Sequence, residues 1–447
     1  MKITEYIKNL FNRIKNNSTA TNIVIVGVVS VIVKVFGFYK EVVIAGEFGL
    51  SEILDTFFIA LLIPGFVNQV FLSAFKSVFI PNYIAEKKAN SSNIAAFQST
   101  SFTITLITSV VFMLIAYLFT DVFLELFYSG HTDNYYRLIK LQFYYLLPCI
   151  LLWGLTSLVS GLLNVYDEFA YSSIYPIITS VVMIICIVFY KDVFGEAVLA
   201  IGMLIGSTIQ FVFLALVALK KHILKFAKPD FKSTNAITMF RQVPAKVSSG
   251  FLTGLIPVTD QYFAAQLLVG SIAALNYGMK IPAFFTTILI LALGNVLLPY
   301  FSKMTLDEPK KAFKTLYWVI KWTFLGILGI VLIASFFSTE IVTLLFERDN
   351  FTSEDTSIVS KIQVIYLIGV PFAICGNLFV KFLTSINKNA FMAYVSFGAM
   401  LLNIILDFAF MNWLGLIGIA LCTTIIQVIK IFVFYGYTNK QKHLLTS

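Results

Sequence analysis

The sequence predicts an all-α polytopic membrane protein with about twelve transmembrane helices, arranged as two six-helix halves around a central cavity. Three observations support this prediction. The 447-residue chain is 59% hydrophobic and only 12% charged, whereas a soluble domain carries roughly 25% charged residues. Apolar runs of about 20 residues, each long enough to cross a bilayer as a helix, recur along the whole length. A proline signature occurs twice and indicates that one half duplicates the other.

The apolar runs place the helices in order along the chain. No short apolar core with a small-residue cleavage site follows the basic first residues, so we expect no cleaved signal peptide. The twelve expected spans are 22–46, 55–80, 97–119, 136–163, 170–190, 196–220, 243–268, 274–300, 315–338, 359–384, 390–410 and 413–437.

The repeated signature lies in the second and eighth spans. Pro64 and Pro282 each follow an isoleucine, and a second proline comes 17 residues later, at Pro81 and Pro299. Because proline removes a backbone donor and clashes with the preceding turn, we expect both helices to kink or end there. Two such helices about 218 residues apart indicate a duplicated bundle, as in many alternating-access transporters, whose halves are related by an axis along the membrane normal.

The most polar internal stretch, 220–242, separates the two halves. A second matched pair of helix-turn-helix segments, 161–178 and 383–400, supports the duplication. The predicted organisation is a basic cytoplasmic N-terminus at 1–21, an N-terminal half at 22–220, a cytoplasmic linker at 221–242, a C-terminal half at 243–437 and a cytoplasmic tail at 438–447.

The distribution of charge predicts the orientation in the membrane. The termini and alternate loops hold 19 Lys and Arg residues, while the opposite set of loops holds four and is rich in Asp and Glu. This is the positive-inside pattern, and it places both termini in the cytoplasm. The net charge of +9 therefore faces anionic membrane lipids, and we expect no nucleic-acid partner.

Nothing in the sequence indicates catalysis. The four cysteines all fall within predicted spans, form no CxxC pair and are best explained as small packing residues. The three histidines lie far apart in loops or in the tail, so no catalytic dyad or triad can be assembled around them. We therefore predict a protein that is not an enzyme. These residues are Cys149, Cys186, Cys375, Cys422, His131, His222 and His443.

Several cations lie inside predicted spans, where ionisable groups are costly and usually face a cavity or a partner. Lys34 and Lys40, the latter beside Glu41, fall in the first span with Gly37 between them, which suggests a bent helix. Snorkelling to the interface is the simpler explanation, but Lys34 lies far from either end of the span. Cations facing a cavity suit an anionic substrate such as a diphosphate.

Three further charged residues belong to the same candidate set. Lys76 lies deep in the second span, and Lys280 lies just before Pro282 in the eighth. If both halves line one cavity, Lys34 and Lys280 could converge on it. Asp55, at the start of the second span, is either a helix-capping carboxylate or a partner for a lysine of the first span.

A separate set of oxygen-bearing side chains lies in the second half. Asn403 and Asp407 are four residues apart in the eleventh span and therefore share a helix face; Asp260 lies in the seventh span and Thr423 in the twelfth. Carboxylate, amide and hydroxyl oxygens are the ligands of hard cations, so this set is a candidate Na⁺ site. The alternative is ordinary hydrogen bonding between helices.

With these residues, the chain resembles the MviN/MurJ family, in the superfamily that also holds Wzx flippases and MATE exporters. The resemblance covers nearly the whole chain. The resemblance depends on the order and spacing of several matching segments. These are VKVFGFYKEVVIAGEFG with DTFFIALLIP, DQYFAAQLLVGSIAALNYGMKIP with VLLPYFSK, LLFERDNFTSEDTSIVSKIQVIYLIGVP, and NIILDFAFMNWLGLIGIALCTT.

The resemblance implies a flippase of the bacterial inner membrane that moves an undecaprenyl-diphosphate-linked saccharide to the outer leaflet by alternating access. It also implies a substrate-binding set, made of residues at positions where the family has arginines or an aspartate and of two residues in the second span. The oxygen-bearing residues of the second half match a sodium site seen in part of the family. These are Lys34, Lys40, Lys280, Asp55, Asn68 and Lys76 for the substrate, and Asp260, Asn403, Asp407 and Thr423 for Na⁺.

The chain departs from the family pattern in ways that leave the cargo open. Three cations are lysines where the family has arginines, and Asn68 with Gln69 replaces a basic pair. The expected cargo is lipid II or a polysaccharide repeat unit. The protein is expected to be monomeric and to need no cofactor, and Na⁺ is the candidate coupling ion. The alternative functions are a MATE-type cation-coupled multidrug exporter and a membrane enzyme of lipid-linked polysaccharide assembly.

Overall fold

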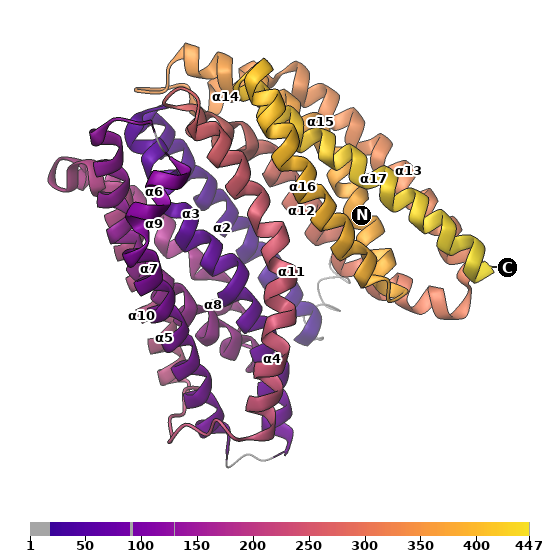
Figure 1. Cartoon of the computed structure of the whole chain (residues 1–447). Coiled ribbons are helices and arrows are strands. Elements are labelled where there is room, and N and C mark those ends of the chain that lie inside the picture. The colour runs from indigo at the N-terminus through magenta and orange to yellow at the C-terminus, as the bar shows by residue number, and fades with distance from the viewer. Residues whose placement is uncertain (1–17, 90–92, 129, 447) are drawn as a thin grey trace, which may run out of the picture. The chain divides into compact units, whose positions relative to one another are not determined.

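A computed structural model describes residues 18–89, 93–128 and 130–446. These residues form helices joined by short turns and contain no β-strand, so the all-α fold class is confirmed (Figure 1). The elements are α2 Ser18–Phe48, α3 Glu52–Val67, η1 Asn68–Leu72, α4 Ser73–Ala89, α5 Ile94–Leu118, α6 Thr120–Phe127, α7 Asp133–Val165, α8 Phe169–Ile174, α9 Pro176–Phe194, η3 Gly195–Ala197, α10 Val198–Lys220, α11 Thr234–Ala265, α12 Ser271–Asp307, α13 Pro309–Phe336, α14 Ser338–Phe346, α15 Ser353–Ser385, α16 Asn389–Leu414 and α17 Leu416–Thr446.

The helices agree with the predicted membrane spans. Within the described part of the chain, nine stretches are long and apolar enough to cross a bilayer, and one of them holds both α9 and α10. Helices α2 and α11, of 31 and 32 residues, coincide with the two remaining predicted spans. The outward faces are apolar: α13, for example, exposes Leu332, Ile333 and Phe336. Such surfaces suit lipid rather than water.

The two halves repeat the same helices at a constant offset. Helices α7 and α15 both contain 33 residues, and each follows a threonine N-cap, Thr132 and Thr352, which lie 220 residues apart. In both cases the threonine side chain accepts a hydrogen bond from a backbone N–H of the first turn, at 3.3 Å. The duplication inferred from the proline signature is therefore visible in the helix boundaries themselves.

The tight turns recur at the same offset. Three pairs of turn residues with positive φ are separated by 220 or 221 residues; they are Gly49 and Gly270, Asp167 and Asn387, and Gly195 and Gly415. Gly, Asn and Asp are the residues that adopt this left-handed conformation at least cost. At Gly49 a Cβ atom would lie 2.2 Å from the Asn350 carbonyl oxygen, so no other residue fits.

The prolines of the repeated signature lie inside helices in both halves. Pro64 lies in α3 and Pro81 in α4, and the second span runs on between them through the π-helical turn η1. Helix α12 continues from Ser271 to Asp307 through both Pro282 and Pro299, so neither proline ends this helix, and the expected kink stays a prediction. Lipid offers no partner to unpaired backbone groups, which favours keeping a membrane helix continuous through a proline.

The chain forms two compact units. The first comprises residues up to Ile44 together with Ile59–Phe251; the second comprises Ala45–Phe58 together with Leu252 to the end. The boundary therefore lies inside α11 and not in the predicted linker 221–242. That segment belongs to the first unit because its backbone is hydrogen-bonded along α5 and Ala236 and Met239 are fully buried in the first unit's core. Residues 1–17 of the predicted cytoplasmic N-terminus lie outside the described residues.

Close packing fixes the helices that carry the candidate site in the second unit. At Gly278 of α12, an added Cβ atom would lie 2.5 Å from the Ile362 side chain of α15, so a glycine is needed for this helix crossing. Further along both helices, the Phe382 ring packs edge-on against Phe301 and Phe313, at centroid distances of 5.2 and 4.9 Å. The relative position of α12 and α15 is therefore well determined by packing.

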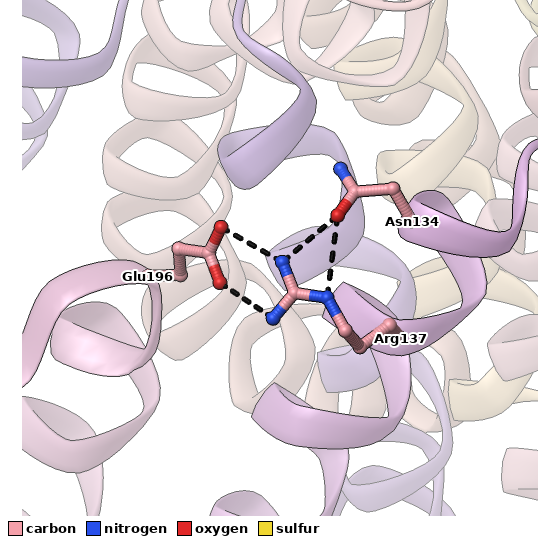
Figure 2. Close-up of polar contacts among 3 residues, drawn as sticks. All are labelled: Asn134, Arg137 and Glu196. Atoms are coloured by element: carbon pink, nitrogen blue, oxygen red, sulfur yellow. Dashed lines mark hydrogen bonds and ion pairs between the residues drawn. The ribbon is translucent and has the colours of Figure 1, made fainter.

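A polar clamp joins two parts of the first unit at the end where α7 begins. The Arg137 guanidinium donates to Glu196 in the turn η3 at 2.9 Å, and to Asn134 in its own helix at 2.8 Å (Figure 2). A second guanidinium nitrogen lies 2.8 Å from the other Glu196 oxygen, so the ion pair is bidentate. Both side chains are exposed, and such pairs contribute at most about 1 kcal/mol.

Candidate functional site

Three helices of the second unit bring the predicted oxygen-bearing side chains together. Asp260 of α11 accepts hydrogen bonds from Asn403 Nδ2 of α16 and from Thr423 Oγ1 of α17, both at 3.0 Å. The amide oxygen of Asn403 accepts in turn from Thr259 Oγ1 at 2.9 Å. Three of the four residues that the sequence predicted for this site are therefore hydrogen-bonded to one another through Asp260.

Asp407 completes this cluster in an unusual way. It lies one turn after Asn403 on α16, is fully buried, and neither of its carboxylate oxygens has a hydrogen-bond partner among the described residues. It is close enough to Asp260 for the two carboxyl groups to interact directly. Two adjacent buried carboxyl groups need a proton or a cation to balance their charge.

The cluster holds two carboxylates, an amide and a hydroxyl, the residue types whose oxygens hard cations prefer. In this structure the Asn403 amide group and the Thr423 hydroxyl donate to Asp260, and the Asn403 oxygen accepts from Thr259. Within the described residues, no group of three or more His, Cys, Asp or Glu side chains could hold a metal ion. The Na⁺ site stays a prediction.

A cavity of about 230 Å³ with a mostly apolar lining adjoins the cluster inside the second unit. It lies between α12, α15 and α17, and it reaches the cluster through Thr423 and the largely buried Tyr366. Its lining mixes apolar side chains, such as Met279 and Val370, with the hydroxyl and amide groups of Thr286, Thr423 and Gln427.

Lys280 lies on α12 at the same level as this cavity. It is partly buried, two residues before Pro282, and its Nζ lies 5.9 Å from the centre of the Phe58 ring. This arrangement is a weak cation–π contact.

The first unit holds the other predicted cations. Lys34 is exposed on α2, whereas Lys40 forms an ion pair with Glu41 at 2.8 Å in which both side chains are mostly buried. Helix α2 continues through Gly37, so the predicted bend does not interrupt the helix. Lys34 and Lys280 belong to different units, and their convergence on one cavity stays a prediction.

The second span, which contains the π-helical turn η1, positions two more predicted residues. Lys76 of α4 donates from Nζ to Ser160 Oγ of α7 at 3.2 Å. Asn68 begins the π-helical turn η1, and its carbonyl oxygen accepts from the Ser73 hydroxyl at 3.1 Å. Lys76 therefore forms a hydrogen bond within the first unit, and the backbone of Asn68 helps to form the π-helical turn.

One intramembrane cation was missed by the sequence analysis. Lys430 lies in α17, three residues after Gln427 of the cavity wall, and is partly buried. No described residue forms a hydrogen bond or ion pair with it. Its signal in the sequence is plain, because it is the only charged residue between 413 and 437.

Asp55 has a different role from the substrate contact expected of it. It is buried at the start of α3, and its two oxygens accept the backbone N–H groups of Gly270 at 2.6 Å and Ala273 at 2.7 Å. Those groups begin α12, so Asp55 caps a helix 215 residues further along the chain. Asp55 thus has a structural role within the second unit, and its contact with a cargo stays a prediction.

Asp55→Asn is expected to destabilise the protein by about 2–3 kcal/mol, because one backbone N–H of α12 then faces an amide NH₂ instead of an acceptor. The measurement is the thermal unfolding midpoint of the purified protein in detergent. Glu340→Gln is the matched control, since Glu340 is an exposed acid in the first turn of α14. An Asp55→Asn midpoint equal to that of the control would show that the cap contributes little.

Comparison with known proteins identifies the family. The sequence model of the family described as lipid II flippase MurJ matches residues 44–447. A probable lipid II flippase MurJ from Buchnera aphidicola subsp. Schizaphis graminum is 26% identical over 429 residues, which cover 93% of this chain and 82% of that protein. The lipid II flippase MurJ of Thermosipho africanus is 25% identical over 405 residues, covering 89% and 81%.

Solved structures share the fold. A lipid II flippase MurJ in an inward closed conformation matches with a TM-score of 0.78 and 24% identity, over 93% of this chain and 87% of that one. A MATE family multidrug resistance transporter in an inward-facing conformation matches with a TM-score of 0.75 and 13% identity, over 94% and 98%. At these identities the structures show the fold alone. The family model, which covers most of the sequence, shows that the chain belongs to the lipid II flippase MurJ family.

Proposed function

We propose that this protein moves an undecaprenyl-diphosphate-linked saccharide, lipid II in the first instance, from the cytoplasmic to the outer leaflet of the bacterial inner membrane. Its membership of the lipid II flippase family, through a match over residues 44–447, carries this proposal. Two bacterial relatives are named as lipid II flippases, and the alignment with this chain covers about four-fifths of each. Transport, not covalent chemistry, is the activity proposed.

The lysines in the apolar helices supply the chemistry that a diphosphate cargo needs. A charge near the bilayer centre costs about 2.5–3.5 kcal/mol or more, so lysines kept there are expected to do work that offsets this cost. In the proposal, Lys34, Lys280 and Lys430 bind the diphosphate as point charges. Lys40 and Lys76 already have partners, Glu41 and Ser160, and exchange them for cargo oxygens as the cargo enters.

The same cations argue against a cation exporter. The MATE structure shares the fold, but an exporter of cationic drugs needs carboxylates and aromatic rings where this chain has lysines. The carboxylates of the second unit, Asp260 and Asp407, are instead buried in a cluster with Asn403 and Thr423.

We assign this cluster as the coupling-ion site of the proposed transport cycle. Na⁺ supplies the positive charge that two adjacent carboxylates require. Asp260 holds the amide of Asn403 and the hydroxyl of Thr423 in place, and Asp407 supplies the second carboxylate of the site. Because these residues lie on α11, α16 and α17, ion binding draws three helices of the second unit together.

Orientation and assembly complete the proposal. The 19 Lys and Arg residues on one set of loops, against four on the other, support cytoplasmic termini. We propose that a single chain suffices and that it works by alternating access.

The direct test is transport by the purified protein in proteoliposomes. Labelled lipid II is placed in one leaflet, and its arrival in the other is followed with and without a Na⁺ gradient. A short polyprenyl-diphosphate repeat unit serves as the competing cargo. Movement of the repeat unit alone would place the cargo among polysaccharide precursors and would overturn the assignment to lipid II.

A further inference from the structure

The segment between α10 and α11 is attached to the membrane bundle along its backbone. Residues 223–232, here called the strap, have no regular helix or strand. Three strap N–H groups donate to consecutive side chains of α5 at 2.8–3.0 Å; the pairs are Lys225 with Gln98 Oε1, Ala227 with Ser99 Oγ and Asp230 with Thr100 Oγ1. Gln98 also donates from Nε2 to the Ile223 carbonyl at 3.0 Å. The strap therefore holds a fixed path on the first unit.

Fixing the backbone in this way leaves apolar and basic side chains projecting outward together. Phe226 and Phe231 are 64% and 46% exposed. Lys225, Lys228 and Lys232 alternate with them and are exposed as well. Two phenylalanines turned outward are unfavourable on a surface facing water alone, whereas phenylalanine and lysine together suit the boundary between lipid and water.

The strap continues the lipid-facing surface of α5. Leu106 and Val110, on the face of α5 that starts at Phe102, are 45% and 38% exposed within a predicted membrane span. The Phe226 ring packs edge-on against Phe102, with centroids 5.8 Å apart. Phe226 thus extends an apolar stripe at the end where the span meets the headgroups.

The charge of the segment favours an anionic partner. Between Lys220 and Lys232 the chain carries five lysines and one aspartate. Lys221 is engaged with Glu168 at 2.6 Å, and that hydrogen bond raises the pKa of Lys221. The three lysines of the strap, Lys225, Lys228 and Lys232, have no ion-pair partner among the described residues.

We propose that the strap is a membrane-interface anchor for anionic phospholipids. Phe226 and Phe231 insert at the level where the acyl chains begin, and Lys225, Lys228 and Lys232 bind lipid phosphates. Because the strap backbone is hydrogen-bonded to α5, binding of the strap to lipid holds the first unit at a defined depth in the membrane. Each lysine is expected to favour an anionic surface by about fivefold. The proposal concerns lipid contact and does not depend on which cargo is transported.

Spin labels on the full chain in liposomes test the depth of the strap. The four native cysteines are buried, which makes cysteines placed at Phe226, Ala89 and Ile107 specific labelling sites. Ala89 is exposed at the end of α4, and Ile107 is lipid-facing within α5. In phosphatidylglycerol liposomes, the label at 226 should be less accessible to a water-soluble nickel chelate than the label at 89. Its depth should lie between those of the labels at 89 and 107.

The charge requirement is tested with the same label at 226. Changing from phosphatidylglycerol to phosphatidylcholine should move the label towards water. The triple variant Lys225→Gln, Lys228→Gln, Lys232→Gln should abolish this dependence on lipid. The matched variant Lys310→Gln, Lys311→Gln, Lys314→Gln, with the same charge change at the start of α13, should retain it. An unchanged depth of the label at 107 shows that the variants are folded.

Two results would overturn the proposal. One is a label at 226 that is as accessible to the nickel chelate as the label at 89 in both lipids, which would make the strap a solvated loop. The other is a label that becomes protected only when cytosolic protein is added, which would make the strap a protein-docking segment.

Discussion

Asp407→Asn is expected to abolish the stabilisation of this protein by Na⁺. Under the proposed assignment a cation balances Asp407 and Asp260 in the wild-type chain, so a saturating concentration of Na⁺ should raise the free energy of unfolding. At 100 times the dissociation constant the gain is about 2.7 kcal/mol. The variant has one buried carboxylate fewer and no repulsion between the two groups, so without Na⁺ it should be at least as stable as the wild type. The measurement is the unfolding midpoint across a Na⁺ titration.

Two controls separate ion binding from general salt effects. Choline chloride at matched ionic strength should leave the wild-type midpoint unchanged. Asp121→Asn removes an exposed carboxylate of the first unit that pairs with Lys140, and it should keep the full response to Na⁺. If Asp407→Asn responds to Na⁺ as the wild type does, the ion lies elsewhere and the cluster is only a hydrogen-bonded helix contact.

Lys280→Gln is expected to slow transport of the diphosphate-linked cargo by about 10- to 100-fold. The substitution keeps most of the side-chain length but replaces a charge-assisted hydrogen bond, which is worth about 1.5–3 kcal/mol, by a neutral one. Lys280→Arg should retain transport, because the positive charge remains and a guanidinium binds phosphate at least as well. The measurement is the initial rate of lipid II flipping in proteoliposomes of equal protein content.

Lys303→Gln is the matched control on the same helix. Lys303 is exposed near the end of α12, among the basic residues expected at the cytoplasmic face, so its substitution should change the rate little. Full transport by Lys280→Gln would contradict the role given to this lysine in binding the diphosphate.

The helices and their duplication could be predicted because they depend on local patterns. Apolar runs of sufficient length form helices in a bilayer wherever they fall, and all twelve expected segments are helical in the described residues. The repeat could be followed further than the prolines suggested, since positive-φ turns such as Asp167 and Asn387 recur at the same offset. The continuity of α12 through Pro282 depends on lipid surroundings that a proline rule does not include.

The ion cluster could be predicted from spacing, but the role of Asp55 could not. Asn403 and Asp407 share a helix face by their four-residue separation, and this placed them correctly together. The partners of Asp55 are backbone groups at Gly270 and Ala273, and a backbone N–H has no sequence signature. A capping carboxylate and a cargo-binding carboxylate look alike until the second helix is seen.

The polar segment 221–242 shows the limit of composition as a guide to domain boundaries. Its lysines and polar residues predict a solvated linker, yet its backbone is bonded to Gln98, Ser99 and Thr100. Three consecutive polar residues near the start of an apolar span were the available sign, since polar side chains in a membrane helix need partners. Lys430 follows the same rule: a lone charge in an apolar run predicts a function.

The most direct test of the central claim is the movement of lipid II between leaflets by the purified chain in proteoliposomes. The account predicts that the wild-type protein moves lipid II, that Lys280→Gln moves it at least tenfold more slowly, and that Lys303→Gln matches the wild type. Empty liposomes set the background rate. Wild-type protein that is folded and correctly inserted, yet moves lipid II no faster than this background, would contradict the account.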